Sequence, residues 1–137
     1  MRKLAGDTKR PFRVRHAALR TADWFVTERR DLVPRRELLA VVGPLLDQED
    51  IADLAVERLR KWRCWDLTER VLALSERRFG EASMKKLVDR SLLRYALQCL
   101  DPRCKTFLAS ERKKEPERVR DVEEMLELEE GKQSESQ

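Results

Sequence analysis

The chain has 137 residues, of which 41% are charged and 6% are aromatic, and it contains only four glycines. This composition is typical of helices with solvated charged faces, and it argues against a β-sheet protein. No apolar run approaches the roughly 18 residues of a membrane-spanning helix, so we expect no membrane contact. The length is sufficient for one domain with a hydrophobic core.

The charge is unevenly distributed along the chain. The net charge is +4, but residues 1–46 contain 11 basic and 5 acidic residues, whereas residues 101–137 contain 8 basic and 11 acidic residues. A basic end of this kind can attract phosphates, although arginine-rich helices also need charged faces simply to stay solvated.

The N-terminus and the cysteines bear on location. The N-terminal segment lacks the apolar stretch of a signal peptide. Cys64, Cys99 and Cys104 are an odd number and form no Cys-x-x-Cys pair, which does not fit a disulfide framework. We therefore expect a reducing, cytoplasmic location.

The first part of the chain predicts an arm and two helices. Residues 1–11 are polar and basic, and we interpret them as a flexible arm. Residues 12–30 carry an apolar stripe at helical spacing. A second helix starts at Pro34, which is favoured at the first helical position. Gly43-Pro44 then predicts a kink or an end near Val42, because proline removes a backbone donor.

The middle of the chain predicts two further helices. Gln48–Asp50 are interpreted as the cap of a helix over residues 51–62. Asp66 and Glu69 have the spacing of a capping box and predict a fourth helix, which we expect to stop at Gly80 as its C-cap.

Residues 81–116 predict a complete helical hairpin. Asp101 is suited to cap a helix whose first residue is Pro102, so one helix ends and another begins within about two residues. The first helix is apolar on more than one face and is expected to pack on more than one side. Its predicted solvated residues are Lys85, Lys86, Asp89, Arg90 and Arg94. A last, acidic helix follows over residues 116–130, and residues 131–137 are expected to be disordered.

The apolar pattern repeats with a period of 37 residues. Segments that start at Val14, Ile51 and Val88 align with apolar residues in their first, fifth, sixth and ninth positions. Repeated helical hairpins of this length are typical of a solenoid. The predicted fold is therefore all-α, with about seven helices arranged as antiparallel hairpins that stack into a short α-solenoid.

These residues resemble HEAT-like repeats. The small alanines of residues 14–19 resemble a HEAT-like repeat helix, and residues 92–97 with Asp101-Pro102 resemble the two helices and turn of another repeat. The resemblance covers about residues 12–114 and implies a single HEAT-like domain over residues 12–130. It also implies a scaffold or binding surface, because HEAT-like families mostly have that role, although a few bind nucleic acid and some are domains of enzymes.

Residue types associated with catalysis or metal binding are sparse. His16 is the only histidine and has no partner acid or nucleophile in the sequence pattern, so we interpret it as a solvated or capping residue. Cys99 and Cys104 flank one turn, but zinc needs about four ligands. No glycine-rich phosphate loop is present. We therefore expect a chain that is not an enzyme, with no cofactor and no metal site.

Six residues are candidates for binding a partner. Arg35 and Arg36 follow Pro34 at a helix N-terminus, where cations do not complement the helix dipole, so they are the best candidates for an anion or an acidic protein. Trp65 and Arg63 lie at an inter-helix turn, where the tryptophan is either a hydrophobic staple or an aromatic hot spot rimmed by cations. Arg13 and Arg20 can share one helix face.

The leading interpretation is a non-catalytic protein-interaction or scaffold module. Its concave face is expected to bind a partner helix or segment, or another domain of a larger chain. The alternative is a nucleic-acid-binding helical module that uses the Arg-rich N-terminal surface, with affinity that falls steeply with salt. A domain cut from a larger enzyme is a third interpretation.

Overall fold

The computed structural model describes residues 11–32 and 34–135, except for the side chains of residues 30 and 132–135. Within this part of the chain, every regular element is a helix and no strand is present. Residues 1–10 of the predicted arm lie outside the described residues. None of the described helices is both long enough and apolar enough to cross a membrane.

The described residues form seven α-helices and three short 3-10 segments, so the prediction of an all-α chain is confirmed. The α-helices are α2 (Phe12–Glu28), α3 (Arg35–Val42), α4 (Ala52–Lys61), α5 (Thr68–Ala73), α6 (Ala82–Gln98), α7 (Pro102–Lys114) and α8 (Pro116–Glu135). The 3-10 segments are η1 (Arg30–Leu32), η2 (Gly43–Asp47) and η3 (Leu74–Glu76).

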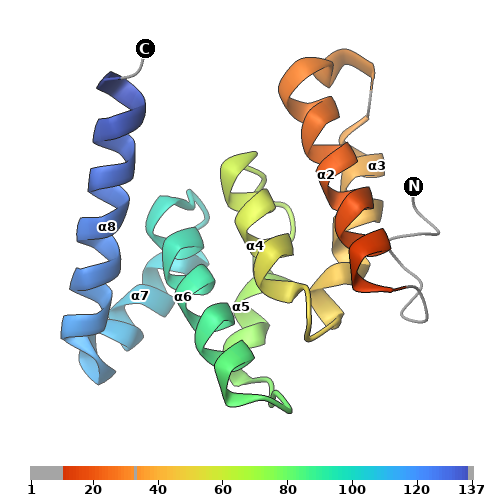
Figure 1. Cartoon of the computed structure of the whole chain (residues 1–137). Coiled ribbons are helices and arrows are strands. Elements are labelled where there is room, and N and C mark those ends of the chain that lie inside the picture. Colours follow the sequence, from red (N-terminus) through yellow and green to blue (C-terminus); the bar gives the residue numbers. More distant parts are fainter. Residues whose placement is uncertain (1–10, 33, 136–137) are drawn as a thin grey trace.

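The helices lie in two layers. In Figure 1, α2, α4 and α6 follow one another across the molecule, α8 lies beyond α6, and α3, α5 and α7 lie behind them. Consecutive helices pack as α2 with α3, α6 with α7, and α7 with α8, while α4 packs against α6. Figure 1 shows that α2, α4 and α6 run in the same direction, so their C-terminal ends lie at the same side of the molecule.

Helix α6 is at the centre of the packing. It contacts α4, α7 and α8, which confirms that this helix is packed on more than one side. Leu92 and Tyr95 are completely buried. The hydroxyl oxygens of Tyr95 and Thr68 are 2.8 Å apart, so the polar end of the buried tyrosine has a partner, as burial of a hydroxyl requires.

The segments that align at a period of 37 residues fall on α2, α4 and α6. The fifth, sixth and ninth aligned positions are buried in all three helices. These residues are Ala18, Ala55 and Leu92; Leu19, Val56 and Leu93; and Ala22, Leu59 and Ala96. The three helices thus present equivalent residues to the core.

Two of the predicted helix boundaries have the expected mechanism. An Oδ1 atom of Asp101 accepts a hydrogen bond from the backbone N of Arg103 at 2.9 Å, and Pro102 is the first residue of α7. Helix α3 ends at Val42, and the chain continues through Pro44 as the 3-10 segment η2. Both signals act locally, which is why the sequence alone reveals them.

The other predicted caps are wrong, because distant arginines bind the polar side chains. The N-cap residue of α5 is Leu67, with no side-chain cap bond, and Asp66 instead accepts hydrogen bonds from Arg35. The N-cap residue of α4 is Ile51. Gln48 and Asp50, predicted to cap this helix, accept hydrogen bonds from the buried guanidinium of Arg15.

Two helix ends differ from the prediction. Gly80 is not a left-handed C-cap, because no described glycine has a positive φ. The helix predicted before it ends earlier, at Ala73, and continues only as η3 to Glu76. The backbone of α8 remains helical to Glu135, whereas the sequence predicts an end at residue 130. A single glycine at position 131 costs a helix only about 1 kcal/mol, so it does not force an end.

Candidate functional site: a charged groove at the end of α4

Two hollows meet at the C-terminal end of α4, and together we call them the α4 groove. The first, of about 440 Å³, lies between α4, α6 and α8 and is lined by Glu57, Arg60, Lys61, Arg63, Arg94, Gln98, Leu126, Glu129 and Glu130. The second, of about 520 Å³, lies between α2 and α4 and is lined by Asp23, Val26, Thr27, Arg58, Lys61, Trp62 and Arg63. Lys61 and Arg63 line both hollows, so they lie at the junction.

The chain reverses sharply at Arg63 to form this junction. The backbone N of Cys64 donates to the carbonyl of Leu59, and the N of Arg63 donates to the carbonyl of Arg60, which is the hydrogen-bond pattern of a Schellman C-cap. This motif places its residue after the helix in the left-handed region, and Arg63 has φ of 53°. Glycine usually occupies that position, because a side chain there is strained.

Arg63 is therefore a strained residue with an exposed side chain. It is the one residue with a positive φ in the described part of the chain, and it makes no ion pair with another described residue. A strained conformation with an exposed side chain is an observation that motivates a functional hypothesis.

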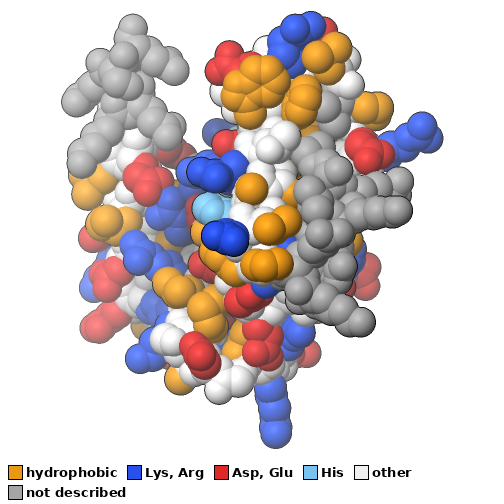
Figure 2. Space-filling view, turned by 45° about the vertical axis from the view of Figure 1, so that its right-hand side comes forward, with side chains coloured by type: hydrophobic (Ala, Val, Ile, Leu, Met, Phe, Trp, Pro, Cys, Tyr) orange, Lys and Arg blue, Asp and Glu red, His pale blue; other side chains and the backbone are white. Residues whose placement is uncertain are grey.

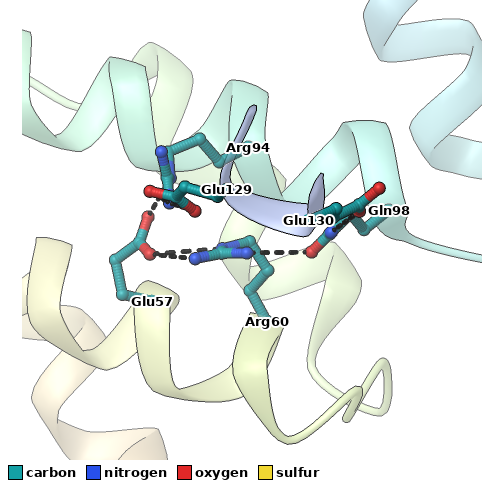
Figure 3. Close-up of polar contacts among 6 residues, drawn as sticks. All are labelled: Glu57, Arg60, Arg94, Gln98, Glu129 and Glu130. Atoms are coloured by element: carbon teal, nitrogen blue, oxygen red, sulfur yellow. Dashed lines mark hydrogen bonds and ion pairs between the residues drawn. The ribbon is translucent and has the colours of Figure 1, made fainter. Parts of the chain in front are cut away.

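The floor of the first hollow is an ionic network. Figure 3 shows Glu57 between two arginines, with its carboxylate 2.8 Å from the Arg60 guanidinium and 3.1 Å from that of Arg94. Arg60 also donates to the side-chain oxygen of Gln98 at 2.9 Å. The two arginines are only 6% and 9% exposed, so each guanidinium depends on these partners rather than on water.

The acidic end of α8 closes one side of this hollow. Arg94 donates to both carboxylate oxygens of Glu129, at 2.7 and 2.9 Å, and the side-chain nitrogen of Gln98 donates to Glu130 at 2.6 Å. Figure 3 shows both glutamates directed toward the α4 and α6 side chains. The acidic helix therefore covers cations of α4 and α6.

The second hollow has an aromatic floor. Trp62 is buried, and its indole nitrogen donates to Asp23 of α2 at 2.8 Å. Asp23 also forms an ion pair with Arg58 at 3.3 Å. Because Arg58 neutralises this carboxylate, the exposed charges of Lys61 and Arg63 dominate the junction. The α4 groove thus has a positive centre with acidic groups at both ends.

Of the predicted candidates, Arg63 alone belongs to this groove. Arg35 donates two hydrogen bonds to Asp66, at 2.7 and 2.9 Å, which also raises the pKa of the guanidinium, and Arg36 is exposed beside it. Trp65 is half-buried and packs edge-on against Tyr95, with ring centroids 5.0 Å apart. The ring therefore faces the core.

Arg13 and Arg20 lie on one face of α2, as their spacing predicts. Both line a shallow, largely apolar hollow of about 670 Å³ that also includes Ala17 and Phe25. Trp24, which is 53% exposed, lies beside it. Figure 2 shows basic and hydrophobic side chains next to one another on this side of the molecule. This α2 face is separate from the groove lining.

Arg94 is buried in the structure, although the sequence predicts a solvated residue at this position. The missing signal is subtle: Arg94 and Gln98 are one turn apart on α6, and Glu57 and Arg60 are one turn apart on α4. Neighbours three or four residues apart share a helix face, so each pair marks a polar face. The 37-residue period is the one sequence feature that relates the two faces, because it places Glu57 and Arg94 at the same position of two successive segments.

Of the residues considered for chemistry, Cys99 and Cys104 lie close together. His16 stacks against Phe12, with ring centroids 5.6 Å apart. Cys64, Cys99 and Cys104 are free thiols, and burial raises the pKa of Cys104, with Cys99 adding to the effect. Among residues 11–32 and 34–135, no group of three or more His, Cys, Asp or Glu side chains is placed to hold a metal ion.

Comparison of the chain with protein-family models, with curated proteins and with solved structures gives no match.

Proposed function

We propose that the chain is a non-catalytic protein-interaction module, a scaffold of the HEAT-like α-solenoid type, that binds an acidic segment of a protein partner in the α4 groove. The partner is a separate protein or another domain of a larger chain. The equivalent buried positions of α2, α4 and α6 and their succession across the molecule support the solenoid. A solenoid with exposed charged hollows between its helices suits binding rather than catalysis.

The observation that carries the proposal is the pair of exposed cations at the groove junction. Lys61 and Arg63 line both hollows, and Arg63 is held in a strained conformation. Carboxylates of a bound segment can pair with both side chains without displacing a core residue. A guanidinium is also the side chain best suited to bind a carboxylate through two hydrogen bonds.

Replacement of the strained Arg63 is expected to raise stability and to lower affinity for an acidic peptide. Replacing Arg63 by Gly is expected to stabilise the chain by about 0.5–1 kcal/mol, because glycine adopts this conformation without strain. The same change removes a groove cation, so affinity for an acidic peptide is expected to fall. Urea unfolding and peptide titration of the same preparation measure the two effects. A variant that is destabilised, or that binds the peptide as tightly as the parent chain, contradicts the role given to Arg63.

The direct test is fluorescence anisotropy with a labelled oligo-glutamate peptide. Reversing both junction charges with Lys61→Glu and Arg63→Glu is expected to weaken binding roughly tenfold or more, since two contacts of under 1 kcal/mol each are lost and replaced by repulsion. The matched control is Lys113→Glu with Lys114→Glu, which makes the same change of net charge at the exposed end of α7. If both double variants lose the same affinity for the peptide, the effect is due to net charge alone, and the proposal that the groove binds the peptide is refuted.

One observation favours nucleic acid as the second candidate. Arg13, Arg20 and the exposed Trp24 lie on the same side of α2, and cations beside an aromatic ring are typical of single-strand binding. Titration with labelled single- and double-stranded DNA and RNA at two salt concentrations tests it. Binding with a steep salt slope that is lost in Arg13→Glu with Arg20→Glu, but retained in the Lys61 and Arg63 double variant, would establish this candidate instead.

We also propose a reducing, cytoplasmic location for this module. The three free thiols support it, because disulfides dominate in oxidising compartments.

A further inference from the structure

The acidic end of α8 lies in the α4 groove as a ligand would. Glu129 binds Arg94 through both carboxylate oxygens, and Glu130 accepts a hydrogen bond from Gln98. Burial opposes ionisation of Glu129, but the hydrogen bond and charge of Arg94, with the charges of Arg60 and Lys61, lower its pKa overall. The hollow thus already holds the chemical group that the proposed partner would bring to it.

These polar contacts hold the last turns of α8 without help from the core. The buried residues of α8 are Val119, Val122 and Leu126. After Leu126, none of the described side chains is buried, and Leu128 is 60% exposed. A helix end that buries little apolar surface opens at low free-energy cost, so it can leave the groove while Leu126 stays packed.

Removing this end would change the charge of the first hollow. With Glu129 and Glu130 in place, its lining contains four cations and three carboxylates; without them, the four cations face Glu57 alone. Carboxylates carried by the same chain act at high effective concentration. They therefore compete strongly with any carboxylate that arrives from solution.

We infer that the partner's binding element is a helix with adjacent glutamates, which replaces Glu129 and Glu130 on Arg94 and Gln98 while the end of α8 is displaced. This inference rests on the proposed function and names the partner element for the same groove. The C-terminal turns of α8 then act as a tethered competitor, and the observed affinity for the partner is lowered by the population in which they occupy the hollow.

The experiment compares two charge-matched variants of the full chain. Glu129→Gln with Glu130→Gln removes the tethered carboxylates, and Glu124→Gln with Glu127→Gln removes two exposed carboxylates of the same helix that line neither hollow. Each is titrated with a labelled helical peptide that contains adjacent glutamates, and circular dichroism verifies the fold. We expect the first variant to bind about fivefold or more tightly than the second, which is the lower end of usual coupling between sites.

Hydrogen exchange supplies a readout that net charge does not affect. On saturation of the parent chain with the peptide, backbone amides after Leu126 are expected to exchange faster and those near Gln98 more slowly. Equal affinities of the two variants, or slower exchange after Leu126, would overturn the displacement of α8. If the parent chain and both variants bind no acidic peptide, or if reversal of Lys61 and Arg63 has no effect on binding, the proposed function itself fails.

Discussion

Replacing Leu92 by Ala is expected to lower the free energy of unfolding by about 2–5 kcal/mol, as for other leucines truncated in a packed core. Leu92 is completely buried on α6, the helix that contacts α4, α7 and α8. Truncation of Leu92 leaves a cavity beside α6. The helices α4, α7 and α8 cannot easily move to fill this cavity, because other contacts with α6 hold them in place. A loss of this size is a large fraction of the roughly 5–15 kcal/mol that stabilises a typical domain.

The matched control for this prediction lies on the same helix. Leu87 is 47% exposed, so Leu87→Ala removes the same atoms from a surface position and is expected to cost less than about 1 kcal/mol. Urea unfolding followed by circular dichroism measures both. Similar costs for the two variants would contradict the central position of α6.

Local signals explain why the helices could be predicted from the sequence. Pro44 and Asp101-Pro102 act through their own backbone and nearest neighbours, so they work in almost any tertiary context. The apolar stripes identify which face of each helix is buried. This is enough for the order and approximate bounds of the helices.

Long-range charge pairing explains what could not be predicted. Asp66 and Asp50 have the right spacing for caps, but each binds an arginine more than 30 residues away in the chain. A guanidinium gives each carboxylate an opposite charge and two hydrogen bonds, whereas a cap bond comes from a single neutral backbone N–H. The choice depends on which helices come together, which the local pattern does not contain.

The groove shows the same limit at the candidate site. Arg60 and Arg94 have the charge expected of surface residues in the sequence. An arginine can nevertheless bury its aliphatic stem while its guanidinium keeps a polar contact. Their carboxylate partners come from α4 and α8. Arg63 could be proposed from its position at a turn, but its strained φ is visible only in the structure.

The second large effect is expected at Glu57. Glu57→Ala removes the carboxylate shared by Arg60 and Arg94, and we expect a loss of about 3 kcal/mol, because breaking one side of a buried ion pair leaves a poorly compensated charge. Arg94 retains Glu129, whereas Arg60 retains the neutral Gln98. Most of the cost is therefore assigned to Arg60.

Asp53 is the control on the same helix. Burial raises the pKa of its carboxyl, so the folded chain disfavours the charge there, while the positive N-terminal end of α4 favours it. These effects oppose each other, and Asp53→Asn is expected to change stability by less than about 1 kcal/mol. Urea unfolding of both variants at neutral pH tests the contrast. If Glu57→Ala lowers the free energy of unfolding no more than Asp53→Asn does, the ionic network is solvated rather than buried.

The network also separates stability from binding. Buried ion pairs can often be exchanged for apolar residues of similar volume with no loss of stability. A chain with Glu57→Leu, Arg60→Met and Arg94→Met together is therefore expected to recover the stability lost in Glu57→Ala, but to bind the acidic peptide more weakly than the parent chain. That combination of results would assign the charges between α4, α6 and α8 to recognition of a partner. If the triple variant is less stable than Glu57→Ala, the ionic contacts hold these helices together.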